Sequence, residues 1–292
     1  MLTRILLHPG QPVAPHDIWS AWNLDPILLG GIAAVAWLYG RGRRRPDWGW
    51  FGVAVLALGL ALVSPLEAMS GALASAHMSQ HLLLILVAAP AFVHSEAAAG
   101  VLGGLPLTVR KGLGLARRTL GLAPARIRRF FHPVLVWLLH AGVLLFWHAA
   151  GPYQLALRLE PVHYLEHASF LITALWFWQL VLSTRHRSID WPGASVLMVF
   201  GLAGQSVFLA LLMTFAESPW YSAYANTTSA WGITPLTDQH LAGVIMWVPA
   251  GFGYTGVGLT LLSRWLTAIE TQTSASERAL LPARGSDRNL GD

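Results

Sequence analysis

Two pairs of histidines, each pair spaced four residues apart, stand where apolar stretches of the chain begin. His77 and His81 lead into LLLILVAAP, and His163 and His167 lie within VHYLEHASF. Residues i and i+4 share one face of a helix, one turn apart, so each pair could hold a metal ion from two sides. Neutral imidazole suits zinc, copper, iron and nickel. The spacing therefore indicates transition-metal chemistry.

The other candidate ligands narrow the choice of metal. Met78 follows His77 directly and adds a thioether, a soft ligand that Cu(I) favours. The chain contains no cysteine, which excludes thiolate ligands, disulfides and iron–sulfur clusters. Glu166 could orient His167 or be an ordinary interfacial carboxylate. Secondary candidates are His148, Asp238 and His240, which lie near the same boundary in other predicted helices, and His140, which lies about 12 Å deeper than His148.

The elements that must position these residues are membrane-spanning helices. Hydrophobic residues make up 54% of the 292 residues and charged residues 11%, whereas soluble domains carry about 25% charged residues. Apolar runs long enough to cross about 30 Å of hydrocarbon recur along the chain. Within lipid, a helix satisfies all its backbone polar groups internally. The composition therefore predicts an all-α, polytopic membrane protein.

Seven apolar runs qualify as spans, and we expect one seven-helix bundle over residues 25–262. The runs cover residues 25–39, 48–63, 77–94, 132–149, 162–182, 193–215 and 240–262. The first two are short for a span of about 20 residues and need flanking tryptophans at the interface. Residues 1–24 would form an external tail. Residues 263–292 would form a cytoplasmic tail, whose polar, aperiodic sequence predicts disorder.

The positive charges between these runs predict the orientation of the bundle. Of the 19 Lys and Arg residues, seventeen fall on one side and only Arg4 and Arg158 on the other. By the positive-inside rule, the side with seventeen basic residues is cytoplasmic, so the N-terminus lies outside and the C-terminus inside. Residues 95–131 then form a cytoplasmic loop, and both histidine pairs lie at the outer boundary.

The net charge and the positions of the histidines also favour some classes of function over others. The net charge of +5 does not indicate nucleic-acid binding here, because topology and attraction to anionic lipid account for the basic loops. Polar residues gathered on one side disfavour a transporter, whose route would place polar groups at every depth. A haem-binding cytochrome stays open beside a copper protein, with two axial histidines such as His140 and His167.

Five segments occur in a fixed order along the chain: AHMSQHLLLILVAAP, FWHAAGPY, HYLEHASFLITALWFW, SPWYSAYA and DQHLAGVIMWVPAG. Together they resemble the CtaG-like cytochrome c oxidase assembly factor family, which serves caa3-type oxidases in bacterial plasma membranes. The resemblance spans about residues 25–262. It implies a handling protein rather than an enzyme, with oxidase subunits as partners and copper delivery to the copper- and haem-containing oxidase as the role.

The resemblance also assigns residues. The family's histidine-rich positions fall on His77, His81, His148, His163 and His167. Its aspartate–glutamine pair falls on Asp238 and Gln239, whereas His240 and the segment PAFVHSE depart from the pattern. We therefore expect an outward-facing copper site of His77, Met78, His81, His163 and His167, with His140, His148, Asp238 and His240 as secondary ligands or supporting groups. Haem is the alternative cofactor. A shared mononuclear site requires His81 and His167 to lie within about 15 Å of each other, given metal–ligand bonds near 2 Å.

Overall fold

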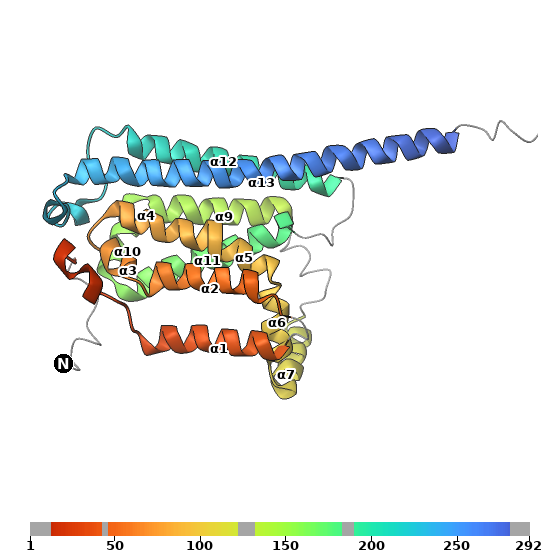
Figure 1. The fold of residues 1–292 in the computed structure, drawn as a ribbon, viewed down its shortest axis with the longest axis horizontal. Helices are drawn as coiled ribbons and strands as arrows, with labels where there is room; N and C mark the ends of the chain where they lie inside the picture. The colour runs from red at the N-terminus through yellow and green to blue at the C-terminus, as the bar shows by residue number, and fades with distance from the viewer. Residues whose placement is uncertain (1–12, 43–45, 122–131, 183–189, 281–292) are drawn as a thin grey trace, which may run out of the picture.

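The chain folds into a bundle of helices that run side by side along one axis (Figure 1). The computed structural model describes residues 13–42, 46–121, 132–182 and 190–280. These residues contain helices and turns but no strand. The all-α prediction is confirmed.

Four helical segments are long and apolar enough to cross a membrane. The first, Ala74–His94, comprises α4 (Ala74–Leu82), a π-helical turn (Leu83–Ala88) and α5 (Ala89–His94). The others are α11 (Glu160–Leu182), α12 (Asp190–Thr214) and α13 (Pro235–Leu280). A fifth span results if α9 (Pro133–His148) and α10 (Ala150–Arg158), which meet at a bend of 71°, count as one.

The predicted count of seven spans is not confirmed, because the first two helices are short. α1 (Pro26–Gly42) has 17 residues and α2 (Trp48–Leu62) has 15. At 1.5 Å per residue they extend only about 26 and 23 Å, less than the roughly 30 Å of hydrocarbon in a bilayer. The tryptophans expected to extend them are exposed: Trp19, Trp22, Trp48 and Trp50.

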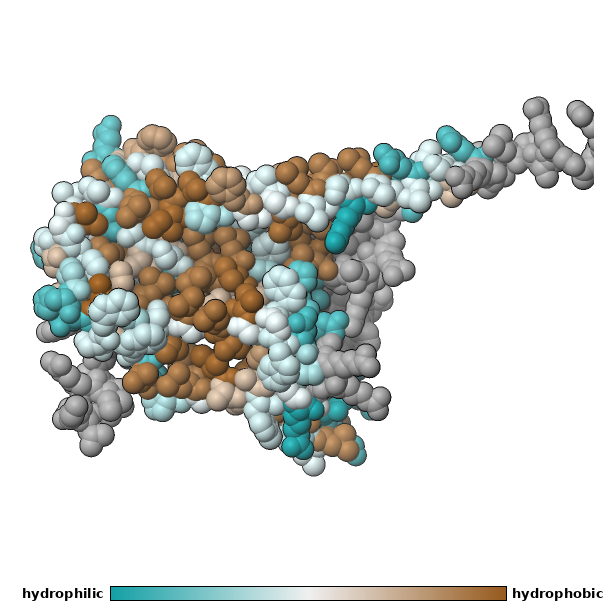
Figure 2. Space-filling view, viewed as in Figure 1, coloured by the Kyte–Doolittle hydropathy of each residue, from teal (hydrophilic) through white to brown (hydrophobic). Residues whose placement is uncertain are grey.

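The sides of the bundle are apolar. Figure 2 shows a broad hydrophobic band over the middle of the molecule, with hydrophilic side chains gathered toward its two ends. Large apolar side chains such as Leu197, Phe208 and Phe252 are more than half exposed. Soluble monomers rarely expose continuous apolar surface on this scale. The surface and the long apolar helices indicate a multi-pass membrane protein.

A glycine contact holds α1 against α6 (Ala97–Gly104). A Cβ atom added to Gly42 would lie 1.8 Å from the Gly100 carbonyl oxygen, and one added to Gly104 would lie 2.0 Å from the Leu38 carbonyl oxygen. Only glycine lets two backbones approach this closely. Tyr39 lies near the same contact, and its hydroxyl donates to the Ser95 carbonyl at 3.0 Å.

The π-helical turn below the histidines of α4 has a local cause. Pro90 has no N–H, so it can make neither the α-type bond to the Leu86 carbonyl nor the π-type bond to the Ile85 carbonyl. The indole N–H of Trp178 on α11 donates to the Ile85 carbonyl at 2.7 Å instead. Because Ile85 lies one turn after His81, this bond fixes α11 against α4 and α5 just below the histidines.

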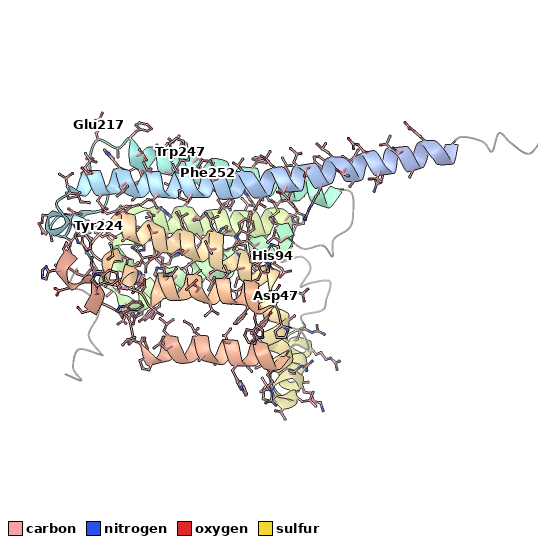
Figure 3. The ribbon with its side chains drawn as sticks, viewed as in Figure 1. Asp47, His94, Glu217, Tyr224, Trp247 and Phe252 are labelled. Carbon is pink, nitrogen blue, oxygen red and sulfur yellow. The ribbon has the colours of Figure 1, made fainter. Side chains whose placement is uncertain are left out.

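The two ends of the bundle differ in chemistry. α7 (Leu107–Thr119) lies at one end, which we call the α7 end (Figure 1). Its exposed cations are Arg110, Lys111, Arg117 and Arg118. α3 (Leu66–Ser70) and α10 lie at the opposite end, the α3 end. Tyr224 also lies there, whereas His94 and Asp47 lie toward the α7 end (Figure 3). The basic residues predicted at 43–45, 126–129 and 185–187 lie outside the described residues.

The C-terminal part of the chain differs from the prediction. α13 continues past Leu262 to Leu280. Residues 263–280 contain no glycine or proline and include the good helix formers Ala, Leu, Glu and Arg, so nothing in the sequence ends the helix. The predicted disorder therefore does not apply to residues 263–280. Residues 281–292 lie outside the described part of the chain.

Candidate metal centre

The two predicted histidine pairs face each other at the α3 end. The ring centroids of His77 on α4 and His163 on α11 are 5.3 Å apart, and those of His81 and His167 are 5.7 Å apart. Within each pair the centroids lie 4.4 and 4.3 Å apart. His81 and His167 thus lie well inside the limit of about 15 Å that a shared site requires.

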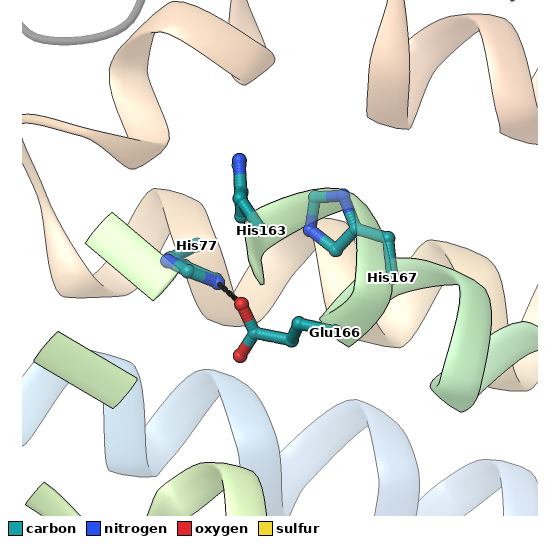
Figure 4. A group of neighbouring side chains, drawn as sticks. All are labelled: His77, His163, Glu166 and His167. Atoms are coloured by element: carbon teal, nitrogen blue, oxygen red, sulfur yellow. Dashed lines mark ion pairs between the residues drawn. The ribbon is translucent and has the colours of Figure 1, made fainter. Parts of the chain in front are cut away.

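Four of the side chains can converge on one point. Ligand atoms of His77, His163, Glu166 and His167 all lie within 4.8 Å of one another (Figure 4). We call these residues the four-ligand centre. Two ligand atoms bound to one ion, with bonds near 2.1 Å, lie at most about 4.2 Å apart. Small side-chain rotations would therefore close the centre around a single ion.

The four-ligand centre is buried between helices. The side chains of His77 and Glu166 are fully buried, and His163 is the most open member at 14% exposure. We expected a site open to the outer leaflet. The structure instead buries His77, Glu166 and His167 and leaves His163 partly exposed, and Tyr224, from the segment between α12 and α13, contacts His77.

The segment 216–234, between α12 and α13, is fastened over the centre by hydrogen bonds. The Tyr221 hydroxyl donates to the His148 carbonyl at 2.9 Å, and the Thr227 hydroxyl donates to the Ala72 carbonyl at 2.7 Å. The Trp220 N–H donates to Gln239 Oε1 at 2.6 Å. The motif SPWYSAYA and Gln239 therefore build the cover of the site.

Several buried polar atoms of the centre lack hydrogen-bond partners within the described part of the chain. They are Nε2 of His77, His163 and His167 and both carboxylate oxygens of Glu166. Buried polar atoms are normally paired, since leaving one unpaired costs about 1–3 kcal/mol. A bound cation would satisfy all five atoms at once.

His77 lies between Tyr224 and Glu166. The Tyr224 hydroxyl donates to the Ser70 carbonyl at 2.9 Å and lies 3.4 Å from His77 Nδ1. His77 Nε2 faces Glu166 Oε2 at 3.4 Å. Imidazole nitrogens and carboxylate oxygens are both metal-ligand types, and a cation between them would offset the cost of burying the carboxylate. The residues present therefore fit a metal ion.

Glu67 on α3 borders the centre on its open side. Its Oε1 lies 3.5 Å from His163 Nδ1, and its other oxygen accepts a hydrogen bond from Gln80. Burial raises the pKa of Glu67 to about 7, and the bond from Gln80 opposes this shift. Glu67 is 18% exposed. It therefore places a second carboxylate at the accessible edge of the centre.

Sequence reasoning missed Glu67 and gave Glu166 only a supporting or interfacial role. One signal was available for Glu166: His163, Glu166 and His167 are spaced i, i+3 and i+4, which places all three on one helix face. Glu67 has no such signal, because α3 and α11 meet only in the tertiary structure.

Two of the secondary candidates lie apart from the four-ligand centre. His140 lies two turns before His148 on α9, about 12 Å along the helix, with its Nδ1 2.8 Å from Thr173 Oγ1. His240 Nε2 is 3.0 Å from the Ala216 carbonyl oxygen and bonds to the covering segment. His148 and Met78 lie beside His81, as described below.

Asp238 caps a helix. Its Oδ2 accepts from the Ala74 N–H at 2.6 Å, and its Oδ1 accepts from the N–H and the hydroxyl of Ser75. Asp238 thus satisfies the free N–H groups at the start of α4 from the neighbouring helix α13.

Replacing Asp238 with asparagine is expected to destabilise the protein by about 1–3 kcal/mol, because an amide N–H₂ would face a backbone N–H. Metal stoichiometry should not change. Thermal unfolding in detergent and metal analysis of the same preparation test both points. Loss of metal without loss of stability would return Asp238 to the list of ligands.

The cavity beside His81 and His148 is too small for a haem. The cavity lined by His81 and His148 measures about 20 Å³. Pockets for organic ligands usually enclose about 300–1,000 Å³. Neither His140 nor His167, the axial pair considered from the sequence, lines this cavity.

A bundle of apolar helices with a buried cluster of histidines and a carboxylate at one end defines a polytopic membrane protein with a candidate metal centre. Residues 33–268 match the family described as cytochrome c oxidase caa3 assembly factor (Caa3_CtaG). The chain belongs to this family, as the sequence motifs predicted.

Two curated relatives are uncharacterised proteins of Mycobacterium bovis and Mycobacterium tuberculosis. Each is 22% identical over 283 residues, which cover 92% of this chain and 43% of the relative. The chain therefore spans less than half the length of these relatives. No solved structure matches the chain.

Proposed function

We propose that this protein binds copper at the four-ligand centre and passes it to cytochrome c oxidase during assembly of the oxidase. Membership of the assembly-factor family supports the partner, the oxidase and its subunits. Copper is the cargo in this proposal, and no residue is assigned a catalytic role.

The observation that carries the proposal is the set of buried, unpaired nitrogen and oxygen atoms in the four-ligand centre. Three neutral imidazoles and the Glu166 carboxylate balance the charge of Cu(I). A divalent ion would need a second negative charge, which Glu67 can supply from 3.5 Å beyond His163. Charge balance matters here because uncompensated charge is costly in a buried site. Nitrogen and oxygen ligands bind Cu(II) more tightly than they bind the other divalent first-row metals.

The orientation in the membrane is part of the proposal. With the α7 end in the cytoplasm, as the positive-inside rule requires, the α3 end faces outward from a bacterial plasma membrane. α1 and α2 then count as two of seven spans, and anionic lipid contacts the exposed cations of α7. Copper would reach the centre at its outer edge, where Glu67 and His163 are partly exposed.

Copper analysis of the oxidase tests the proposal. In cells that lack this chain but are otherwise unchanged, we expect the purified oxidase to retain haem and lose copper. The full-length protein, purified in detergent, should bind copper when Cu(I) or Cu(II) is added. An oxidase with normal copper but missing haem would favour the haem alternative and contradict the proposal.

A further inference from the structure

A second group of possible ligands surrounds a cavity one turn deeper than His77. The cavity measures about 20 Å³, which is enough for one water molecule or a metal ion. Four of the side chains that line it are known metal-ligand types: Met78, His81, His148 and Met246. They come from α4, α9 and α13.

His148 is oriented as a ligand. Its Nδ1 lies 2.7 Å from the Leu144 carbonyl oxygen, which can only accept, so Nδ1 carries the proton. Nε2 then carries the lone pair, is buried, and has no hydrogen-bond partner among the described residues. Metal-binding histidines almost always donate their other N–H to a carbonyl, a carboxylate or water in this manner.

His81 stands between the four-ligand centre and the cavity. His81 is 3% exposed, and neither ring nitrogen has a hydrogen-bond partner in the described structure. Nε2 is 3.5 Å from Glu166 Oε1, and the ring centroid is 5.9 Å from that of His148. With metal–nitrogen bonds near 2 Å, two imidazoles on one ion have centroids about 6 Å apart.

The two methionines that line the cavity indicate which metal ion it would bind. Met78 and Met246 are 1% and 5% exposed, and both line the cavity. Thioethers are soft ligands that select Cu(I) over zinc. None of the described residues that line the cavity carries an acidic side chain. A ligand set without negative charge, in apolar surroundings, favours a monovalent ion over a divalent one.

We propose that Met78, His81, His148 and Met246 form a second site, which binds Cu(I). We call it the thioether site. It goes beyond the proposed function, because its ligands do not require the four-ligand centre to be filled. Its ligand His81 lies 3.5 Å from Glu166 of the four-ligand centre. A Cu(I) ion therefore has a short path from the partly exposed His163 into the bundle, with no change in oxidation state.

The thioether site is tested with the full-length protein in detergent, under anaerobic conditions, with Cu(I) alone as the probe. X-ray absorption at the copper edge should detect sulfur ligands in the wild-type protein. M78L/M246L should remove the sulfur signal and weaken Cu(I) binding at this site by at least about tenfold. Leucine nearly preserves the volume of methionine, so the packing should survive.

Two further variants make the result specific. Met213→Leu is the matched control, because Met213 is fully buried in the same apolar cluster as Met78 and Met246 but does not line the cavity. It should keep the sulfur signal. H163N/E166Q disables the four-ligand centre and should still bind one Cu(I) with sulfur ligands.

Sulfur ligation that persists in M78L/M246L would overturn the thioether site, as would loss of all Cu(I) binding in H163N/E166Q. Failure of the four-ligand centre has a different signature. In that case the wild-type protein and H163N/E166Q would bind the same number of copper ions, all with sulfur ligands.

Discussion

Replacing Glu166 with glutamine is expected to weaken metal binding at the four-ligand centre by at least about 100-fold, since loss of groups that only orient ligands already costs 10- to 100-fold. The metal-free variant should be as stable as the wild type or more stable. Both Glu166 oxygens are buried without a hydrogen-bond partner in the described structure, and a neutral amide is easier to bury than a carboxylate. The substitution should therefore lower the affinity for metal but should not lower the stability of the metal-free protein.

Thermal unfolding with and without Cu(I) measures both effects. Wild-type protein should be stabilised by about 2.7 kcal/mol at a metal concentration 100 times the Kd, and E166Q should lose the part of this gain that the four-ligand centre supplies. Glu160→Gln is the control on the same helix, because Glu160 bonds to Tyr164 outside the centre. A metal-free E166Q that melts at a lower temperature, with its metal response intact, would make Glu166 a structural residue.

Helix periodicity explains what the sequence could predict about the site. His77 and His81, like His163 and His167, share a helix face wherever the helix packs. The same geometry shows why the predicted set of five ligands divides in two. Met78 is adjacent to His77 but three residues before His81, so it shares a face with His81 and not with His77. The cavity contains both Met78 and His81.

Contacts between distant segments explain what the sequence could not predict. Glu67 lies beside His163 from another helix, and the Tyr224 hydroxyl lies 3.4 Å from His77 Nδ1 from a segment far along the chain. Asp238 stands beside His240, yet its carboxylate turns to the start of α4. No spacing rule within one helix encodes these contacts, because each depends on which helices pack together.

The sequence was sufficient to predict the fold class but not the points at which helices bend or are interrupted. Apolar composition was sufficient to predict helices, but the run expected at residues 132–149 continues into α10 after a bend of 71°. Ala149 has extended backbone angles there, with ψ at 139°. The bend places His148 at the end of α9 and α10 beneath the covering segment. Hydropathy alone does not detect such a break, since both sides of it are compatible with a helix.

Replacing His77 and His81 together is expected to have the largest effect in cells. His77 belongs to the four-ligand centre, and His81 lines the cavity of the thioether site, so H77N/H81N should disable both. Asparagine is polar and smaller than histidine. The variant should still insert into the membrane, because both histidines are buried in the bundle and do not face lipid. Oxidase copper and activity should fall to the level of cells without the chain.

His240→Asn is the matched control for this experiment, because His240 also lies at the α3 end but bonds to the Ala216 carbonyl. It should leave oxidase copper unchanged at equal protein abundance in the membrane. The single variants then separate the two sites. H77N should lose only the four-ligand centre and keep sulfur-ligated Cu(I), whereas H81N should lose that sulfur-ligated ion. If H77N/H81N supports an oxidase with full copper and activity, these histidines serve packing, and neither site takes part in copper transfer.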